Sequence, residues 1–210
     1  MIELFGSALV TFLVIIDPPG CAPIFASLTR GATPAHRRSM AIRSSLYAWL
    51  ILMFFAVLGK PLLHALGISL ASFRIAGGIL LFYIAVDMVF EKRTERRENR
   101  AHSIEGTPDA DDVSIFPMAM PMIAGPGSIA SAMLWVSRAE VMIHVVIVLA
   151  AITVVMLLTM VTLLAAGPMM RLIGDKVEAA ITRILGVILA ALAAQFVIDG
   201  LKQSFPHVLG

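Results

Sequence analysis

The chain has 210 residues, of which 59% are hydrophobic and 14% are charged, and its formal net charge is +2. A typical soluble domain is about 45–50% apolar and about 25% charged, so this composition excludes a water-soluble globule and indicates a protein of the lipid bilayer. The single cysteine, Cys21, excludes an internal disulfide, and cysteine and histidine are not spaced as a metal or haem site. We therefore predict no metal and no cofactor. We also predict no nucleic-acid partner, because no basic and aromatic element lies outside the apolar segments.

Six apolar segments each have close to the ~20 residues that a helix needs to cross a hydrocarbon core of about 30 Å. They cover approximately residues 4–28, 42–66, 70–90, 113–136, 141–166 and 179–201. The first segment lacks the basic start and the cleavage site of a signal peptide, so we expect it to be retained. The sequence thus predicts an all-α, polytopic membrane protein of six transmembrane helices.

The basic residues are divided unequally between the connections that join these segments. Of the sixteen Lys and Arg residues, twelve lie in or beside the connections after the first, third and fifth segments. The other four are Lys60, Arg74, Arg138 and Lys202. Because cytoplasmic connections carry the excess of basic residues, we expect both termini on the outer, periplasmic side.

The longest polar stretch, residues 91–112, divides the chain into a first three-helix repeat at 1–90 and a second at 113–210. It begins with a run of mixed charge and continues through Gly-Thr-Pro at 106–108. This pattern predicts a solvated cytoplasmic linker that is helical at first and then loose. A tail that binds a partner is the alternative.

The two halves resemble each other at a spacing of about 107 residues. Three pairs of segments correspond in the same order: 17–20 with 124–127, 61–67 with 168–174 and, after a slip of two residues, 74–80 with 183–189. Because each half has three spans, the second half enters the bilayer from the opposite face, which makes the repeats inverted. Inverted repeats are typical of secondary transporters. A duplication that only built a helix bundle is the alternative.

Proline and glycine interrupt the first span of each half. Asp-Pro-Pro-Gly at 17–20 should break the hydrogen-bond ladder of the first span, and Pro117, Pro121 and Pro126 should break that of the fourth. Irregular backbone in the hydrocarbon region persists only where protein or a water-filled cavity surrounds it. Two interruptions at equivalent positions therefore favour a shared central site over a pair of unrelated kinks.

Each break offers two kinds of main-chain group to a ligand. The helix that resumes has free amide N–H groups for an anion, and the helix that stops has free carbonyl oxygens for an ammonium group or a small cation. An amino-acid zwitterion fits both. We therefore predict a small-molecule substrate bound by the residues at the breaks: Asp17, Pro19, Gly20, Cys21, Gly125, Pro126, Gly127 and Ser128.

Asp17 is an ionisable residue near the middle of a predicted span. Such a residue costs about 2.5–3.5 kcal/mol on the insertion scale and is usually functional. We hypothesise that Asp17 holds the substrate ammonium group or a coupling ion, or that it carries a coupling proton. The alternative is that its carboxylate caps the helix that resumes after the break.

Three motifs carry a family resemblance. They are Asp-Pro-Pro-Gly-x-x-Pro-Ile-Phe at 17–25, Phe-Pro-x-Ala-x-Pro-x-x-Ala-Gly-Pro-Gly-Ser-Ile at 116–129, and Arg-Ile-Ala-Gly-Gly-Ile-Leu at 74–80. In these segments the chain resembles the MarC family of bacterial inner-membrane proteins, and the similarity covers nearly its whole length. The resemblance implies six membrane helices. It also implies a relation to the small neutral amino acid transporters, which take up residues such as glycine and alanine.

Together these features predict a secondary transporter of a small solute, expected to be a small neutral amino acid, driven by a proton or sodium gradient. An exporter of drugs or metabolites and a non-transporting structural or regulatory membrane protein are the alternatives. The chain has no phosphate-binding loop of the G-x-x-x-x-G-K-[ST] type, so it cannot use ATP itself. A hydrolase would need a nucleophile with a base or a pair of carboxylates, and only Asp17 and Asp87 offer such a pair in the first half. We predict no catalytic residues and no enzymatic activity.

Overall fold

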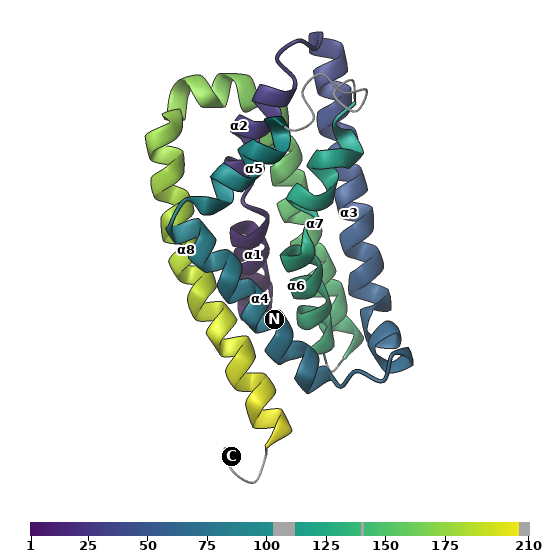
Figure 1. Ribbon diagram of the computed structural model, residues 1–210. Coiled ribbons are helices and arrows are strands. Elements are labelled where there is room, and N and C mark those ends of the chain that lie inside the picture. The colour runs from purple at the N-terminus through teal and green to yellow at the C-terminus, as the bar shows by residue number, and fades with distance from the viewer. Residues whose placement is uncertain (103–111, 140, 206–210) are drawn as a thin grey trace.

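The computed structural model describes residues 1–102, 112–139 and 141–205, and within these ranges the chain consists of helices and turns (Figure 1). The elements of the first half are α1 (Ile2–Ile16), α2 (Pro18–Leu28), α3 (Pro34–Ala65), α4 (Leu70–Val89) and the short α5 (Lys92–His102). Those of the second half are the wide helical segment η2 (Ser114–Ile123), α6 (Pro126–Ser137), α7 (Met142–Leu164) and α8 (Ala166–Ser204). The all-α class predicted from the sequence is confirmed.

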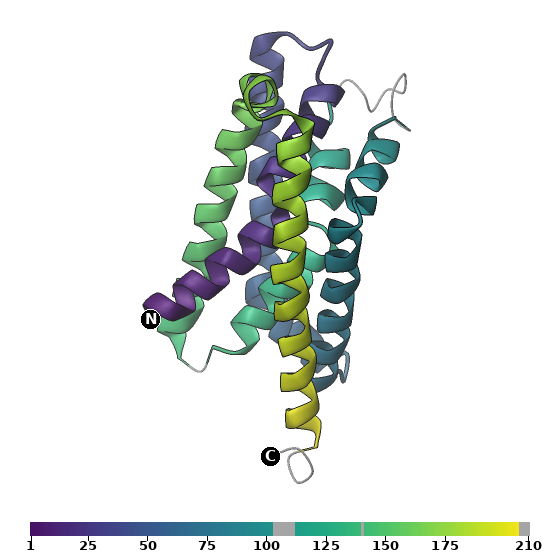
Figure 2. The same cartoon turned by 90° about the vertical axis from the view of Figure 1, so that its left-hand side faces the viewer.

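The predicted membrane spans correspond to helices of sufficient length and apolar character. In the described part of the chain, five continuous or nearly continuous segments qualify: Ile2–Leu28, Pro34–Ala65, Leu70–Val89, Met142–Leu164 and Ala179–Ser204. η2 and α6 form a sixth span if the pair, which is bent by 56°, is counted as one. In Figures 1 and 2 the start of α1 and the last turn of α8 lie toward one end of the bundle, whereas α5 and the start of α8 lie toward the other.

The broken first span lies at the centre of the bundle. In its most apolar stretch 72% of the residues are buried, compared with 28–33% in the four other continuous spans. The side chains of Phe12, Ile15 and Ile16 in α1 are fully buried or nearly so. A break in this span is therefore enclosed by protein, which is the condition under which irregular backbone persists in a membrane.

The two halves contact each other in matching pairs of elements. α1 and α2 pack against α7 of the second half, and η2 and α6 pack against α3 of the first half. α2 also contacts α8, just as α6 contacts α4. The most extensive contact within the described ranges joins α4 to α8, the third spans of the two halves.

Glycines allow α4 and α8 to approach each other closely. A Cβ atom at Gly78 would lie 2.9 Å from the carbonyl oxygen of Ala193, and a Cβ atom at Gly186 would lie 3.1 Å from that of Ala85. In lipid, helices associate through this kind of close van der Waals packing, because burial of apolar surface gives no advantage there. The α4–α8 contact is therefore a tight seam between the two halves.

A tight corner at Phe90 and Glu91 joins α4 to α5. Glu91 adopts a left-handed backbone conformation, with φ 60°, and its N–H donates to the carbonyl oxygen of Met88 at 3.3 Å. The Glu91 carboxylate pairs with Arg183 of α8. The corner turns α5 back over the bundle, where it contacts α2, α4 and η2.

Candidate functional site at the two helix breaks

Asp17 ends α1 and begins α2. Its backbone is left-handed, with φ 56° and ψ 66°, a conformation that aspartate tolerates better than most residues. Pro18 and Pro19 fill the first two positions of α2, where a helix has no intrahelical use for an N–H group. The first amide that needs a partner is that of Gly20, and Asp17 Oδ1 accepts a hydrogen bond from it at 3.2 Å. Asp17 therefore caps the start of α2, which is the alternative role predicted for it from the sequence.

Gly20 is the residue that leaves room for this cap. A Cβ atom at position 20 would overlap the Oδ2 atom of Asp17 and would lie 3.1 Å from Nη1 of Arg97. The glycine in the Asp-Pro-Pro-Gly motif is therefore required by the approach of two charged side chains to the first turn of α2.

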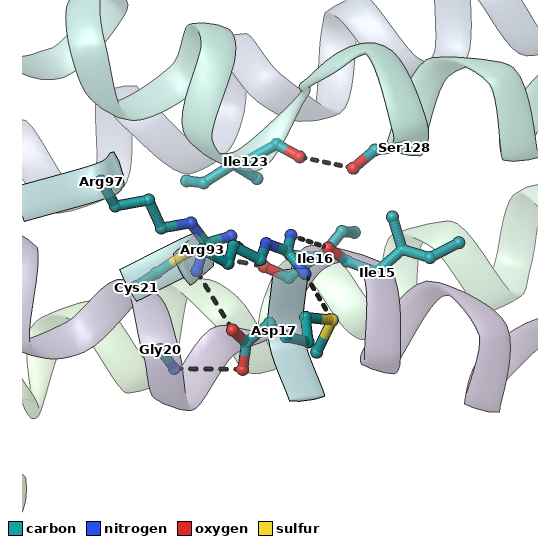
Figure 3. Close-up of polar contacts among 10 residues, drawn as sticks. Ile15, Ile16, Asp17, Gly20, Cys21, Arg93, Arg97, Ile123 and Ser128 are labelled. Atoms are coloured by element: carbon teal, nitrogen blue, oxygen red, sulfur yellow. Dashed lines mark hydrogen bonds and ion pairs between the residues drawn. The ribbon is translucent and has the colours of Figure 1, made fainter. Parts of the chain in front are cut away.

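The second oxygen of the Asp17 carboxylate faces α5. Asp17 Oδ2 accepts from Arg97 Nη1 at 3.1 Å, and the two side chains are only 1% and 8% exposed. Arg97 Nη2 also donates to the carbonyl oxygen of Ile16 at 3.4 Å, and Arg93 donates to that of Ile15 (Figure 3). These carbonyls belong to the last turn of α1, where intrahelical hydrogen bonds run out. Two guanidinium groups of α5 thus cover the stopped end of α1.

This arrangement corrects one expectation about residues 91–112. The predicted helical start is confirmed by α5, but the prediction that the linker is solvated is wrong for the face that carries Arg93 and Arg97. Hydropathy scales rank arginine as strongly hydrophilic and so predict that it is exposed to water. Here a buried carboxylate and main-chain carbonyls are its hydrogen-bond partners instead. The segment expected to be loose, around 106–108, lies outside the described residues.

The second break lies between η2 and α6. Phe116 and Met120 depart from helical backbone angles within η2, and α6 begins at Pro126 after an extended Gly125. Gly125 is required here because a Cβ atom would lie 2.5 Å from the carbonyl oxygen of Pro121. The prolines and glycine predicted to interrupt this span do so.

One side chain of the resumed helix holds a freed carbonyl at each break. Ser128 Oγ donates to the carbonyl oxygen of Ile123 at 2.8 Å. At the first break the Cys21 thiol lies 3.5 Å from the carbonyl oxygen of Ile16, which it can reach as a weak donor. The two breaks therefore share a local hydrogen-bond pattern.

A cavity of about 250 Å³ lies at the second break and is bordered by α4 and α5. The second break contributes Gly125, Pro126, Gly127 and Ser128 to its wall, so these four predicted site residues come together. The first break contributes Ile15, whereas the predicted residues Asp17, Pro19, Gly20 and Cys21 do not line the cavity. The charged part of the wall comes from three arginines of α5 and one aspartate of α4: Arg93, Arg96, Arg97 and Asp87.

The charges on this wall are largely paired with each other. Asp87 is 6% exposed and pairs with Arg96, which also donates to the hydroxyl of Tyr83. Arg97 pairs with Asp17, and Arg93 is held by main-chain and thioether acceptors. The guanidinium groups supply hydrogen-bond donors beside the cavity. Within the ranges that the structure describes, no three His, Cys, Asp or Glu side chains gather where they could hold a metal ion.

The arginines of α5 are the part of this site that sequence reasoning missed. Arg93, Arg96 and Arg97 follow the i, i+3, i+4 spacing of one helix face. That periodicity is visible in the sequence and predicts a face with a common environment. It does not say which acidic or carbonyl groups the face meets.

A bundle of membrane-length helices with a broken central span and a cavity lined by charged side chains defines a polytopic helical membrane protein. The chain belongs to the MarC family, because the family model described as MarC family integral membrane protein matches residues 2–205. It is 36% identical to a UPF0056 membrane protein of Archaeoglobus fulgidus, over 96% of this chain and 94% of the relative. The family resemblance inferred from the three motifs is confirmed.

Two further relatives come from Escherichia coli strain K12. The UPF0056 membrane protein YhcE is 33% identical, over 93% of this chain and 90% of its own length. The UPF0056 inner membrane protein YhgN is 34% identical, over 94% and 95%. No solved structure matches the chain significantly.

Proposed function

We propose that the chain is a secondary transporter of the bacterial inner membrane and that it moves a small neutral amino acid by alternating access. In this proposal the two three-helix halves are inverted repeats, both termini are periplasmic, and a proton or sodium gradient drives the cycle. The observation that carries the proposal is the cavity at the second helix break, with the start of α6 in its wall and Ile15 of α1 beside it.

The start of α6 supports an anionic group of the solute in this cavity. The first amides of a helix have no intrahelical partner and lie at the positive end of its dipole. Pro126 has no N–H group, so the amides of Gly127 and Ser128 are the ones available beside the cavity. The carboxylate of an amino acid suits these donors.

The close packing at Gly127 supports a solute with a small side chain. A Cβ atom at this position would overlap Cδ1 of Ile84, which also lines the cavity. Gly127 and Ile84 therefore already pack against each other in the cavity wall. A bulky solute would have to displace them.

The pairing of elements between the halves supports inverted repeats. The broken span of each half packs on the second helix of the other half, and the third helices pack on each other. Reciprocal contacts of this kind are expected when a two-fold axis relates two halves of opposite orientation. The contacts of Cys21 and Ser128 with a preceding carbonyl add a match at the level of single side chains.

Counterflow into proteoliposomes loaded with glycine, alanine or serine tests this function directly. We expect the purified protein to accelerate uptake of the labelled amino acid several-fold over protein-free vesicles, and Gly127→Leu to abolish the effect, because the added side chain would displace Ile84 and distort the cavity wall. Ile79→Ala, at a position of α4 that is 59% exposed, is the matched control and should transport normally.

The absence of counterflow with all three amino acids would contradict the proposed substrate class. Counterflow of a drug or another metabolite instead would favour the exporter, and no flux of any solute would favour a structural or regulatory protein. Repeating the assay at two pH values, with and without sodium, identifies the coupling ion.

A further inference from the structure

The first break presents the groups that a bound cation needs. They are the carboxylate of Asp17 and the carbonyl oxygens of Ile15 and Ile16 at the stopped end of α1. In the structure these acceptors are engaged by guanidinium groups from the protein itself, Arg97 on Asp17 and Ile16 and Arg93 on Ile15. The guanidinium groups of Arg93 and Arg97 thus occupy the position that a bound cation would take.

Arg97 also separates Asp17 from the cavity. Arg97 lines the cavity wall, whereas Asp17 does not, and the two side chains are in contact through Nη1 and Oδ2. A solute in the cavity therefore meets the arginine before it meets the carboxylate. For an ammonium group to reach Asp17, the guanidinium has to leave.

Because the side chains of Asp17 and Arg97 are both buried, the observed fold requires that they pair with each other. A carboxylate that is 1% exposed requires a compensating charge, since an unpaired buried ion is strongly disfavoured. Arginine suits the role because its planar, permanently charged group donates to two acceptors at once, here the Asp17 carboxylate and the Ile16 carbonyl.

We propose that Arg97 is a built-in counter-ion that takes the place of an external cation at the first break, and that α5 withdraws before a cation binds Asp17. The identification of that cation as the ammonium group of an amino acid, or as a coupling ion, rests on the proposed function. The role of Arg97 as the counter-ion of Asp17 rests on the ion pair alone.

Chemical rescue of Arg97→Ala tests the counter-ion role. This variant of the full-length protein in detergent should melt about 5 °C or more below the parent, because it leaves a buried carboxylate unpaired. Millimolar guanidinium or methylguanidinium chloride should restore the melting temperature in a saturable manner, whereas equal sodium chloride should restore less. The double variant Asp17→Asn/Arg97→Ala is the control, and guanidinium should not stabilise it.

Two results would overturn the counter-ion role. One is an Arg97→Ala variant that melts like the parent. The other is stabilisation of the double variant by guanidinium to the same extent as the single variant. If Arg97→Ala does not fold, Arg97→Lys keeps the positive charge but loses the second donor and should melt between the parent and Arg97→Gln, and a melting temperature equal to that of Arg97→Gln would equally contradict the proposal.

The native cysteine reports on how well α5 covers the first break. Cys21 is the single cysteine of the chain, is 0% exposed and follows Gly20, whose position faces Arg97. Its alkylation by N-ethylmaleimide should be slow in the parent and roughly tenfold faster in Arg97→Ala, because labelling requires local opening at the first break. Guanidinium should slow it again. Equal rates in the two proteins would mean that α5 does not cover this break.

These measurements separate the counter-ion from transport. Rescue and protection of Cys21 without any counterflow would leave the role of Arg97 standing and remove the proposed function. Counterflow without rescue or protection would support the proposed function and contradict the counter-ion role of Arg97.

Discussion

Cys21 and Ser128 stand 107 residues apart in the chain and make the same contact. The Cys21 Sγ atom lies 3.5 Å from the carbonyl oxygen of Ile16, and the Ser128 Oγ atom lies 2.8 Å from that of Ile123. In each case a side chain near the start of one helix reaches the end of the helix before it. The two breaks are built alike in this respect, although only the first carries a carboxylate, at Asp17.

Exchanging the two side chains should therefore be tolerated. Cys21→Ser and Ser128→Cys keep a donor for the freed carbonyl, and each should melt close to the parent. Ser128→Ala removes the donor from a buried carbonyl and should cost about 1–3 kcal/mol of stability. Thermal unfolding in detergent measures all three variants. A Ser128→Cys variant as unstable as Ser128→Ala would argue against the shared contact.

Asp17→Asn should separate the cap from the ion pair. The amide oxygen of asparagine still accepts from the Gly20 N–H, but Arg97 loses the charge that compensates it in the buried site. Removing one partner of a buried pair costs about 3–5 kcal/mol, and uptake normalised to surface expression should fall. Asp199→Asn is the matched control, because the Asp199–Arg138 pair is 30% and 27% exposed and should matter less.

The uptake of Asp17→Asn also bears on coupling. A variant that reaches the surface and transports at the parental rate, with the parental dependence on pH, would exclude Asp17 from any coupling step.

Gly20→Ala should destabilise the first break. The added Cβ atom meets the Asp17 carboxylate, so the cap and the Arg97 pair must shift, at a cost of about 1–3 kcal/mol. Gly6→Ala in α1 is the control, since no atom lies within 4 Å of the added Cβ, and alanine favours a helix interior by about 0.5–1 kcal/mol. Equal melting temperatures for the two variants would show that Gly20 is not needed for space.

Gly78→Ala should loosen the seam between α4 and α8. Its Cβ atom would lie 2.9 Å from the carbonyl oxygen of Ala193 and 3.0 Å from the amide nitrogen of Val197, and backbone atoms cannot move aside as a side chain can. We expect a loss of about 1–3 kcal/mol in thermal unfolding. Gly167→Ala, whose nearest neighbour would be 3.9 Å away, should leave the melting temperature unchanged.

The spans and the breaks were predictable because both follow from local chemistry. Apolar runs of membrane length define the helices, and Pro19 with Gly20, and Pro126 with Gly127, mark where the ladder stops. These signals need no knowledge of the rest of the chain. The predicted positions of the spans agree with the helices for this reason.

The position of α5 could not be predicted in the same way. The pair that holds it joins Arg97 to Asp17, 80 residues earlier, and hydropathy treats a helix rich in arginine as solvated. The sequence shows that Arg93, Arg96 and Arg97 share a face, but the partner of that face is set by the corner at Glu91 and by the packing of α1. For the same reason, sequence reasoning grouped Asp17 with the cavity, whereas the structure places Arg97 between them.

The two-residue corner at Phe90 and Glu91 links the position of α5 closely to that of α4. Because so short a connection cannot absorb a large displacement, a displacement of α4 would be passed on to α5 and to the Arg97–Asp17 pair. Among the described residues, α4 is also the helix of the first half with the most extensive contact to the second half, so in the proposed alternating-access cycle a movement between the halves would be transmitted to Arg97. In that proposed cycle, rearrangement of the bundle and exposure of the Asp17 carboxylate would therefore be coupled.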